Sequence, residues 1–248
     1  MIGARFDDAT QIVQGLRSIK SEGEIDKIRH AAQIASTAFA QVPEIIHSGM
    51  SEIEVFRAFK LACLSLGADD VAYLVGGAGE GGYGDIISPP SQRCLQNGDV
   101  LILDVGLVWD GYFCDFDRNF AVGDANDAAA KAHEVVWQAT EAGLAAAMPG
   151  NTCADLFEAM NEVMVPHAVV SSGDVGRLGH GLGMQLTEFP SHTAWDNTQL
   201  QAGMVLTLEP GFAFDENKMM VHEENIVVRE GGCELLTRRA ARQMPIIK

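Results

Sequence analysis

Two segments far apart in the chain repeat one pattern, and each contains an acid in apolar surroundings. Residues 95–106 and 200–211 both read as a turn with glycine, a short apolar run typical of a buried strand, and one acid followed two residues later by glycine. The acids are Asp104 and Glu209, at the ends of the two predicted strands. A buried carboxylate is costly unless a partner compensates its charge. The repeat therefore predicts one shared site at a pseudo-two-fold axis.

The repeat extends upstream of these strands. Residues 49–59 match residues 150–160, and each copy has a Ser or Thr three residues before an acid. That spacing is typical of a capping box at the start of a helix, and the glycine before it permits the left-handed conformation that ends the preceding helix. Chance similarity between two α/β segments is the alternative, but the features agree in order and at nearly constant offset. We therefore expect two half-repeats, at about 25–122 and 127–228.

Local periodicity predicts helices and strands in each half. The predicted elements are helices over residues 25–47, 52–66, 127–147 and 153–164 and strands over residues 70–76, 100–108, 112–122, 204–209 and 220–228. The glycine-rich run at 76–82 lacks the Lys-Ser/Thr ending of a phosphate loop, so we interpret it as a mobile loop. No linker interrupts the pattern, and we predict one α+β domain over residues 1–248.

Composition limits the classes of function that this chain can have. The 248 residues are 47% hydrophobic, which is enough for one sizeable core, and no apolar run reaches the roughly 18 residues of a membrane span. The N-terminal residues lack a signal-peptide pattern. Five cysteines are scattered and never form a CxxC pair, which favours reduced thiols in a cytoplasmic protein. A net charge of −17 argues against nucleic acid or an anionic membrane as a partner.

Further carboxylates and one histidine extend the predicted site. Asp115 and Glu224 lie in the strands that follow Asp104 and Glu209, and His180 lies between glycines, where a backbone can approach a ligand closely. Four carboxylates that converge in an apolar core would raise one another's pKa values unless cations neutralise them. Oxygen-rich ligands with one nitrogen favour Mn²⁺, Fe²⁺, Co²⁺ or Zn²⁺, and two such ions could activate a water molecule as a nucleophile. Each acid taken alone could instead be a surface residue or pair with a basic neighbour.

The set of motifs resembles the pita-bread metallohydrolases, a superfamily that includes methionine aminopeptidase, aminopeptidase P, prolidase and the metal-free relative creatinase. Its ligand motifs are a DxG strand, a DxxR segment, GHGxG, a TxEPG-type segment and an E(N/D) pair. The corresponding residues of this chain are Asp104, Asp115, His180, Glu209 and Glu224. The resemblance extends from about Leu16 to Leu236, which is nearly the whole chain.

This resemblance implies a fold, a cofactor and an activity. The fold would be an α+β pita-bread domain, and the cofactor would be two divalent metal ions, with Mn²⁺ the first expectation. The activity would be hydrolysis of small peptides with proline in second position, as in aminopeptidase P or prolidase, by a cytoplasmic homodimer. Residues 16–22 look like the linker that follows the amino-terminal domain of the larger relatives, so we expect that domain to be absent.

Two departures from the family pattern leave the substrate open. The peptidases carry one histidine seven residues after the ligand histidine and another three residues before the proline of a P-x-D-R-x-L segment, which corresponds to Pro90 here. These positions hold Thr187 and Ile87 in this chain. Thr187 can donate a hydrogen bond but cannot shuttle a proton near neutral pH. Two alternatives therefore remain: a lyase or amidohydrolase that acts on an osmolyte-like small molecule, and a binding module without turnover. Phe189 and Trp195 are candidates to line the substrate pocket.

Four residues are candidates for direct roles in catalysis. Glu209 is the candidate proton shuttle, because a carboxylate at the metals can take a proton from water and pass it to the leaving nitrogen. His222, two residues before Glu224, is expected near the metals, and His192 could reach the cleft from a loop. Thr187 completes this set as a hydrogen-bond donor in place of a histidine.

Two further acids, Glu223 and Asp117, adjoin the predicted ligands and are candidates for supporting roles. Neighbouring side chains of a strand point to opposite faces, so Glu223 and Glu224 should not both bind metal. The E(N/D) pair of the family corresponds to Glu224 with Asn225, and we therefore assign the ligand role to Glu224.

Overall fold

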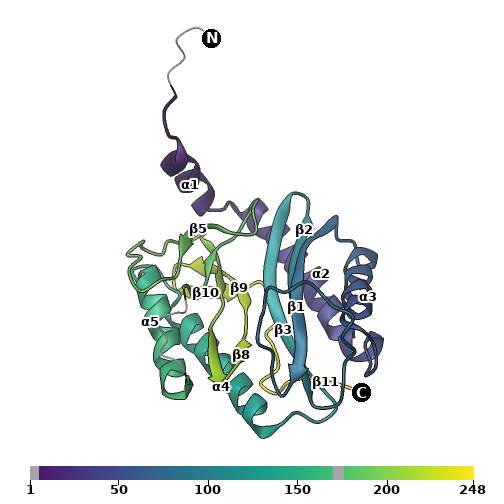
Figure 1. The fold of residues 1–248 in the computed structure, drawn as a ribbon. Helices are drawn as coiled ribbons and strands as arrows, with labels where there is room; N and C mark the ends of the chain where they lie inside the picture. The colour runs from purple at the N-terminus through teal and green to yellow at the C-terminus, as the bar shows by residue number, and fades with distance from the viewer. Residues whose placement is uncertain (1–5, 170–175) are drawn as a thin grey trace.

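The computed structural model describes residues 6–169 and 176–248, and Figure 1 shows two halves side by side. The first half and the C-terminal strand that joins it contain α1 (Thr10–Ser18), α2 (Glu22–Ile45), α3 (Glu52–Ser65), β1 (Asp70–Glu80), β2 (Asp99–Trp109), β3 (Tyr112–Val122) and β11 (Ile246–Ile247). The second half contains α4 (Asp127–Ala146), α5 (Cys153–Met164), η1 (Val165–His167), β4 (His180–Gly181), β5 (Glu188–Ser191), β6 (Val205–Leu208), β7 (Gly211–Asp215), β8 (Lys218–Val221), β9 (Glu224–Arg229) and β10 (Gly232–Leu235). In each half two long helices, α2 and α3 or α4 and α5, precede the strands.

Strands β1, β2, β3 and β11 form the first sheet in that order. β2 and β3 pair in antiparallel register, with Asp104 opposite Asp117 and Gly106 opposite Asp115. Residues opposite each other in an antiparallel pair project from the same face, and so do residues two apart on one strand. One face of this sheet therefore carries three carboxylates, while the other is apolar apart from Arg118, whose guanidinium lies over Phe116.

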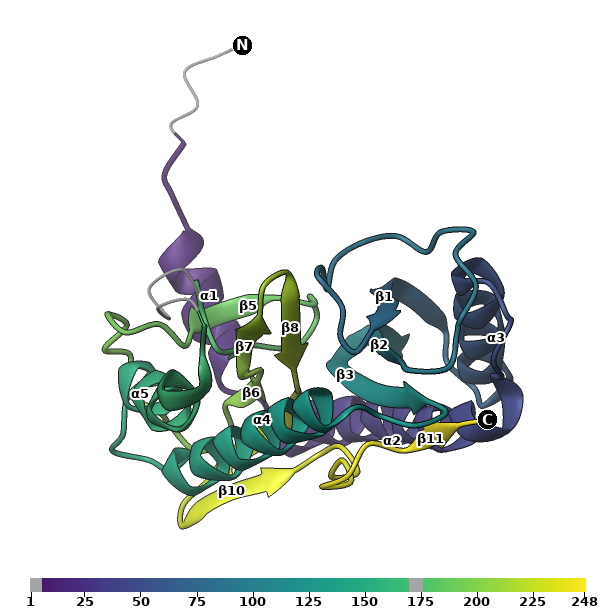
Figure 2. The same cartoon turned by 60° about the horizontal axis from the view of Figure 1, so that its bottom comes forward.

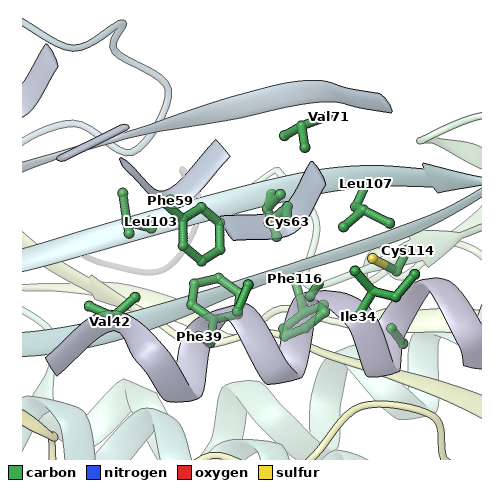
Figure 3. Close-up of a cluster of buried hydrophobic side chains, with 14 of the residues drawn as sticks. Ile34, Phe39, Val42, Phe59, Cys63, Val71, Leu103, Leu107, Cys114 and Phe116 are labelled. Carbon is green, nitrogen blue, oxygen red and sulfur yellow. The ribbon is translucent and has the colours of Figure 1, made fainter. Parts of the chain in front are cut away.

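Helices α2 and α3 cover the apolar face of the first sheet. Figure 3 shows Phe39 and Val42 of α2, Phe59 of α3 and Phe116 of β3 pointing toward one another. The ring centroid of Phe39 lies 4.6 Å from that of Phe59 and 5.2 Å from that of Phe116. Full burial of such a side chain stabilises the fold by about 1.5–3 kcal/mol. This packing holds the acid-bearing strands in place.

The second sheet has the order β10-β9-β6-β4-β5, and β7 and β8 form a separate hairpin. Helices α4 and α5 pack around a second apolar core that includes Leu156, Leu206 and Ile226. Figure 2 shows α2 and α4 running along the same side of the molecule beneath the strands. The side chain of Asn225 joins the halves, because it accepts a hydrogen bond from the Asp115 N–H at 3.0 Å and donates one to the Asp115 carbonyl.

The predicted helices agree with the structure. α2, α3, α4 and α5 begin and end within a few residues of the predicted bounds. The capping boxes at Ser51 and Thr152 are confirmed, since each pairs reciprocally with the acid three residues later, Glu54 or Asp155. These signals are local, so the sequence alone contains them.

Three predictions about strands are wrong in detail. The glycine-rich run is not a mobile loop over its whole length, because β1 continues to Glu80. At Gly76 (φ 130°) a Cβ would overlap Ile102 O, so glycine lets β1 approach β2 closely. Asp104 lies in the middle of β2 rather than at its end. The single strand predicted over 220–228 is broken between β8 and β9.

Helix α1 projects from the body near the N-terminus, as Figure 1 shows. The segment that follows is fastened to the second half by Lys20, whose buried ammonium lies 3.1 Å from Glu188 Oε2. Arg17 Nη1 donates to Gln185 Oε1 at 3.1 Å. No helix in the described part of the chain is long and apolar enough to cross a membrane.

Candidate metal centre

Asp115, His180 and Glu223 converge where the two halves of the chain meet. One potential ligand atom from each lies within 4.8 Å of the other two, and all three residues are buried. Asp115 lies on β3 and His180 on β4, whereas Glu223 lies in the break between β8 and β9. Elements far apart in the sequence therefore direct two carboxylates and one imidazole at one point.

Asp104 and Glu209 flank this cluster. Nε2 of His180 lies 3.5 Å from Asp115 Oδ2 and 3.8 Å from Glu209 Oε2. Asp104 shares the acidic face of the first sheet with Asp115, and its charge contributes to the raised pKa of Glu223. Four of the five predicted metal ligands are thus brought together, with Glu223 in addition.

Backbone contacts fix the orientation of the His180 ring. Nδ1 lies 2.9 Å from Gly181 O, where an Nδ1–H donates, and the His180 N–H donates to Thr207 Oγ1 at 3.1 Å. Nε2 is consequently the atom directed at the carboxylates, which is the usual arrangement of a metal-binding histidine. Gly179 makes the loop possible, because at its φ of 142° a Cβ would overlap Thr207 O.

Burial and mutual repulsion disfavour the ionised form of these acids. Burial raises the pKa of Asp104 well above its usual range, and the charge of Asp115 raises it further. Burial also raises the pKa of Asp115 to about 6 and that of Glu223 well above its usual range. Burial lowers the pKa of His180, but the hydrogen bond with Asp115 and the charge of Glu209 outweigh it, so this pKa is raised. Divalent cations would relieve the repulsion.

The donor set fits such cations. Among residues 6–169 and 176–248, three buried carboxylate oxygens near this site have no hydrogen-bond partner: Asp104 Oδ1, Asp117 Oδ1 and Glu223 Oε1. Buried polar atoms in folded proteins are nearly always paired, so unpaired oxygens beside an imidazole need a ligand. Several carboxylate oxygens with one imidazole nitrogen match Mn²⁺, Fe²⁺, Co²⁺ or Zn²⁺.

The prediction that Glu224 faces this cluster is wrong. Its Oε2 accepts a hydrogen bond from Arg118 Nη2 at 2.8 Å and another from the Thr237 hydroxyl. Its Oε1 accepts from Arg239 Nη1 at 3.1 Å and from a backbone N–H at 2.9 Å. Because adjacent side chains point to opposite sides, Glu223 takes the inward position that the motif had suggested for its neighbour.

The prediction that His222 points near the metals is also wrong. Its Nδ1 lies 3.0 Å from Thr140 Oγ1 and its Nε2 lies 3.1 Å from Arg239 Nη1, on the side of Glu224. Burial, followed by the charges of Arg118 and Arg239, holds the pKa of His222 well below its usual value. The neutral ring therefore packs with the ion pairs of Glu224, on the side away from the Asp115, His180 and Glu223 cluster.

His192 does not reach a cleft from its loop. The ring is fully buried, Nε2 lies 3.0 Å from Thr207 O, and burial lowers the pKa to about 3. A Cβ on Gly179 would overlap this ring, so His192 packs beneath the turn that presents His180. Its role is to support that turn, which corrects the predicted catalytic role.

Thr187 is exposed and contacts a residue that sequence reasoning missed. Arg177 Nη2 donates to Thr187 Oγ1 at 3.4 Å, and Arg177 Nε donates to Glu209 Oε1 at 3.3 Å. The Arg177 side chain is 38% exposed, so a ligand can reach it. A single arginine three residues before His180 follows no general pattern that would identify it. Ile87, at the other departure from the family, is exposed in a loop.

Tyr73 is a second residue that the sequence did not reveal. Its phenol lies near enough to Asp104 to offset part of the rise in the pKa of that acid, and it lies opposite Gly106 in the β1–β2 register. A Cβ on Gly106 would lie 2.9 Å from Tyr73 Cβ and would overlap Leu186, so the glycine of the DxG motif makes room for both. The contact depends on strand register, which no local motif specifies.

A cleft of about 730 Å³ opens between α1 and the segment around β5. Thr187 and Phe189 line it, whereas the Asp115, His180 and Glu223 cluster does not. Trp195 is 74% exposed and does not line this cleft, whereas Phe189 does. Thr187 links the lining of this cleft to Glu209, because both residues accept hydrogen bonds from Arg177.

Comparison with known proteins assigns the fold and the site to a class. The sequence model of metallopeptidase family M24 matches residues 26–230, and the chain belongs to this family. It is 28% identical over 237 residues to the Xaa-Pro dipeptidase of Pyrococcus furiosus, which covers 94% of this chain and 67% of that protein. Two solved structures are similar: X-Pro aminopeptidase from Thermotoga maritima (TM-score 0.86, 29% identity, 96% of this chain and 67% of that chain) and dipeptidase PepE from Mycobacterium ulcerans (TM-score 0.89, 28% identity, 96% and 64%).

These matches confirm the resemblance and the α+β pita-bread fold that it implied. The matched region contains every residue of the acidic cluster, and a metallopeptidase family implies divalent metal ions at such a site. The chain spans 60–67% of the length of the curated relatives it matches.

Proposed function

We propose that this protein is a metal-dependent hydrolase of small peptides with proline in second position. The observation that carries the proposal is the convergence of Asp115, His180 and Glu223, flanked by Asp104 and Glu209. The similar proteins are named Xaa-Pro dipeptidase, X-Pro aminopeptidase and dipeptidase, which supports this choice of substrate.

Two divalent cations are the proposed cofactor, with Mn²⁺ the expected ion. The residues that would hold them are Asp104, Asp115, His180, Glu209 and Glu223. When bound, such ions lower the pKa of a water molecule and polarise the carbonyl of the scissile bond. The chain itself supplies proton transfer, substrate orientation and a buried, preorganised setting.

Glu209 is the proposed proton shuttle. Its carboxylate lies 3.8 Å from His180 Nε2, and its side chain is 21% exposed, so it stands between the buried cluster and the solvent. From there it can accept a proton from the attacking water and deliver it to the leaving nitrogen of the substrate. A histidine-independent route of this kind is needed because Thr187 cannot carry a proton.

Arg177 is the proposed binding residue for the carboxylate of a short peptide. Its guanidinium reaches Glu209 on one side and Thr187 on the other. A guanidinium holds a carboxylate through two parallel hydrogen bonds, which fixes orientation as well as position. A dipeptide held in this way would present its peptide bond to Glu209, with the Thr187 hydroxyl as an additional hydrogen-bond donor.

A substrate panel on the Mn²⁺-loaded protein tests this function. Xaa-Pro dipeptides and tripeptides are compared with matched Xaa-Ala peptides by release of the N-terminal amino acid. We expect cleavage of the Xaa-Pro peptides, loss of that cleavage in Glu209→Gln, and retained cleavage in Glu52→Gln. Glu52 is a matched control because it is a buried glutamate hydrogen-bonded to Ala78 and Ser91, outside the site. Metal-loaded protein that cleaves no Xaa-Pro peptide would contradict the proposal.

Thr187 favours a second candidate, a lyase or amidohydrolase for an osmolyte-like molecule. An uncharged hydroxyl in place of a histidine changes what the site can donate to a substrate. Small betaine, sulfonium and cyclic amidine compounds therefore belong in the same panel. Turnover of one of these without cleavage of any peptide would establish this candidate, and metal binding without any turnover would indicate a binding module. We also propose a homodimer, which light scattering tests directly.

A further inference from the structure

Asp117 lies on the same face of the first sheet as the acids of the metal centre. It is directly opposite Asp104 in the β2–β3 register and two residues after Asp115. The Cβ atoms of residues paired in this way lie about 4.5–5.5 Å apart. Asp117 is 2% exposed, so water does not solvate its carboxylate. Its position alone places a fully buried acid beside the proposed ligands.

The side-chain donors around Asp117 are committed to other acceptors, and the donor that faces its carboxyl group is the backbone N–H of Glu223. In the described part of the chain, no donor pairs with its Oδ1. The Tyr83 hydroxyl donates to Asn119 Oδ1 at 2.8 Å, and Asn119 Nδ2 donates to a backbone carbonyl at 2.6 Å. Arg118 directs its guanidinium at Glu224 and at backbone oxygens. Asp117 is therefore a buried carboxylate with an oxygen that no neighbouring donor satisfies.

The negative charge of the carboxylates around Asp117 favours a bound cation. An unpaired buried carboxylate is costly, and a nearby cation removes that cost. Five carboxylates lie at this site when ionised: Asp104, Asp115, Asp117, Glu209 and Glu223. The guanidinium of Arg177 pairs with Glu209 and neutralises one of these charges. Four negative charges remain, and two divalent ions carry the same number of positive charges.

We propose that Asp117 supplies a further anionic oxygen to the divalent-cation site, next to Asp104. The inference rests on the proposed metal centre but is independent of peptide hydrolysis. A further carboxylate makes the donor set harder and more negative, which strengthens the binding of oxygen-preferring ions such as Mn²⁺. Asp117 is thus a metal-site residue in addition to the five that the proposed function uses.

The test is Mn²⁺ binding to metal-free Asp117→Asn, measured by isothermal titration calorimetry beside the wild type. Asparagine preserves the shape of the side chain and removes its charge. Loss of a group that supports a metal site lowers affinity about 10–100-fold. We therefore expect at least one Mn²⁺ to bind tenfold or more weakly. A smaller change at both ions would overturn the proposal.

Controls separate this inference from the metal centre itself. If the wild type binds no Mn²⁺, the proposed centre fails; if wild type and Asp117→Asn bind equally, only the role of Asp117 fails. Glu52→Gln, which also removes a buried carboxylate, should keep its affinity within twofold of the wild type. A tenfold loss there as well would mean a general effect and would overturn the assignment. Should Asp117→Asn fail to fold by circular dichroism, Asp117→Ser is measured against the same tenfold threshold.

Discussion

In the metal-free protein, stability should fall as the pH rises from 6.5 to 8.5. Asp104, Asp117 and Glu223 are buried carboxylates whose pKa values in the folded state lie well above those of the unfolded chain. Between the two pKa values the folded state keeps protons that the unfolded chain has released. The free energy of unfolding therefore decreases as the pH rises, and the stabilising contribution is lost as the pH passes the folded pKa.

Asp117 gives the size of the effect. Each proton retained by the folded state changes the free energy of unfolding by about 1.36 kcal/mol per pH unit. With a pKa of about 8, Asp117 accounts for about 2 kcal/mol between pH 6.5 and 8. Asp104, Glu223 and the raised pKa of His180 act in the same direction. The buried His133, His192 and His222, whose pKa values are lowered by burial, act in the opposite direction, mostly below pH 6.5 and only weakly between pH 6.5 and 7.5, where the unfolded imidazole loses its last protons.

Urea unfolding of chelator-treated protein at pH 6.5, 7.5 and 8.5, followed by circular dichroism, measures this dependence. Excess Mn²⁺ should raise stability and remove the decline, because bound cations replace the protons. Asp117→Asn lacks one titrating carboxylate, so its metal-free curve should be flatter by about 2 kcal/mol. A metal-free wild type whose stability is constant or increases across this window would refute the reasoning.

Three substitutions test other parts of the site. Glu223→Gln should weaken Mn²⁺ binding in calorimetry and abolish turnover. Glu224→Gln should leave the metal ligands in place but lower the free energy of unfolding by about 3–5 kcal/mol. The reverse pattern would mean that Glu224 is the metal ligand, as the sequence motif predicted. Arg177→Met should raise KM for Xaa-Pro dipeptides about tenfold or more with little change in kcat, and should not affect C-terminally amidated substrates. Thr187→His should accelerate Xaa-Pro cleavage by up to about 10²-fold, and unchanged or lower peptidase rates would favour the osmolyte class.

Local signals explain why much of this molecule could be predicted from its sequence. The capping boxes at Ser51 and Thr152 each need only four consecutive residues, so the sequence alone predicts where these helices begin. The convergence of Asp115 and His180 could be predicted because each residue lies in a short motif of the family, DxxR for Asp115 and GHGxG for His180. Tyr73 and Arg177 carry no comparable motif, and their positions depend on strand register and loop path.

The choice between Glu223 and Glu224 shows what the sequence could not settle. Two adjacent acids fit one motif, and strand alternation requires only that they point apart. The break between β8 and β9 and the guanidinium groups of Arg118 and Arg239 decide which one turns inward, and both are non-local. Glu224 has its charge neutralised by arginines, so its role is structural. Glu223, like Asp117, keeps one buried oxygen that no donor in the described part of the chain satisfies, and an acid of this kind is the one that needs a cation.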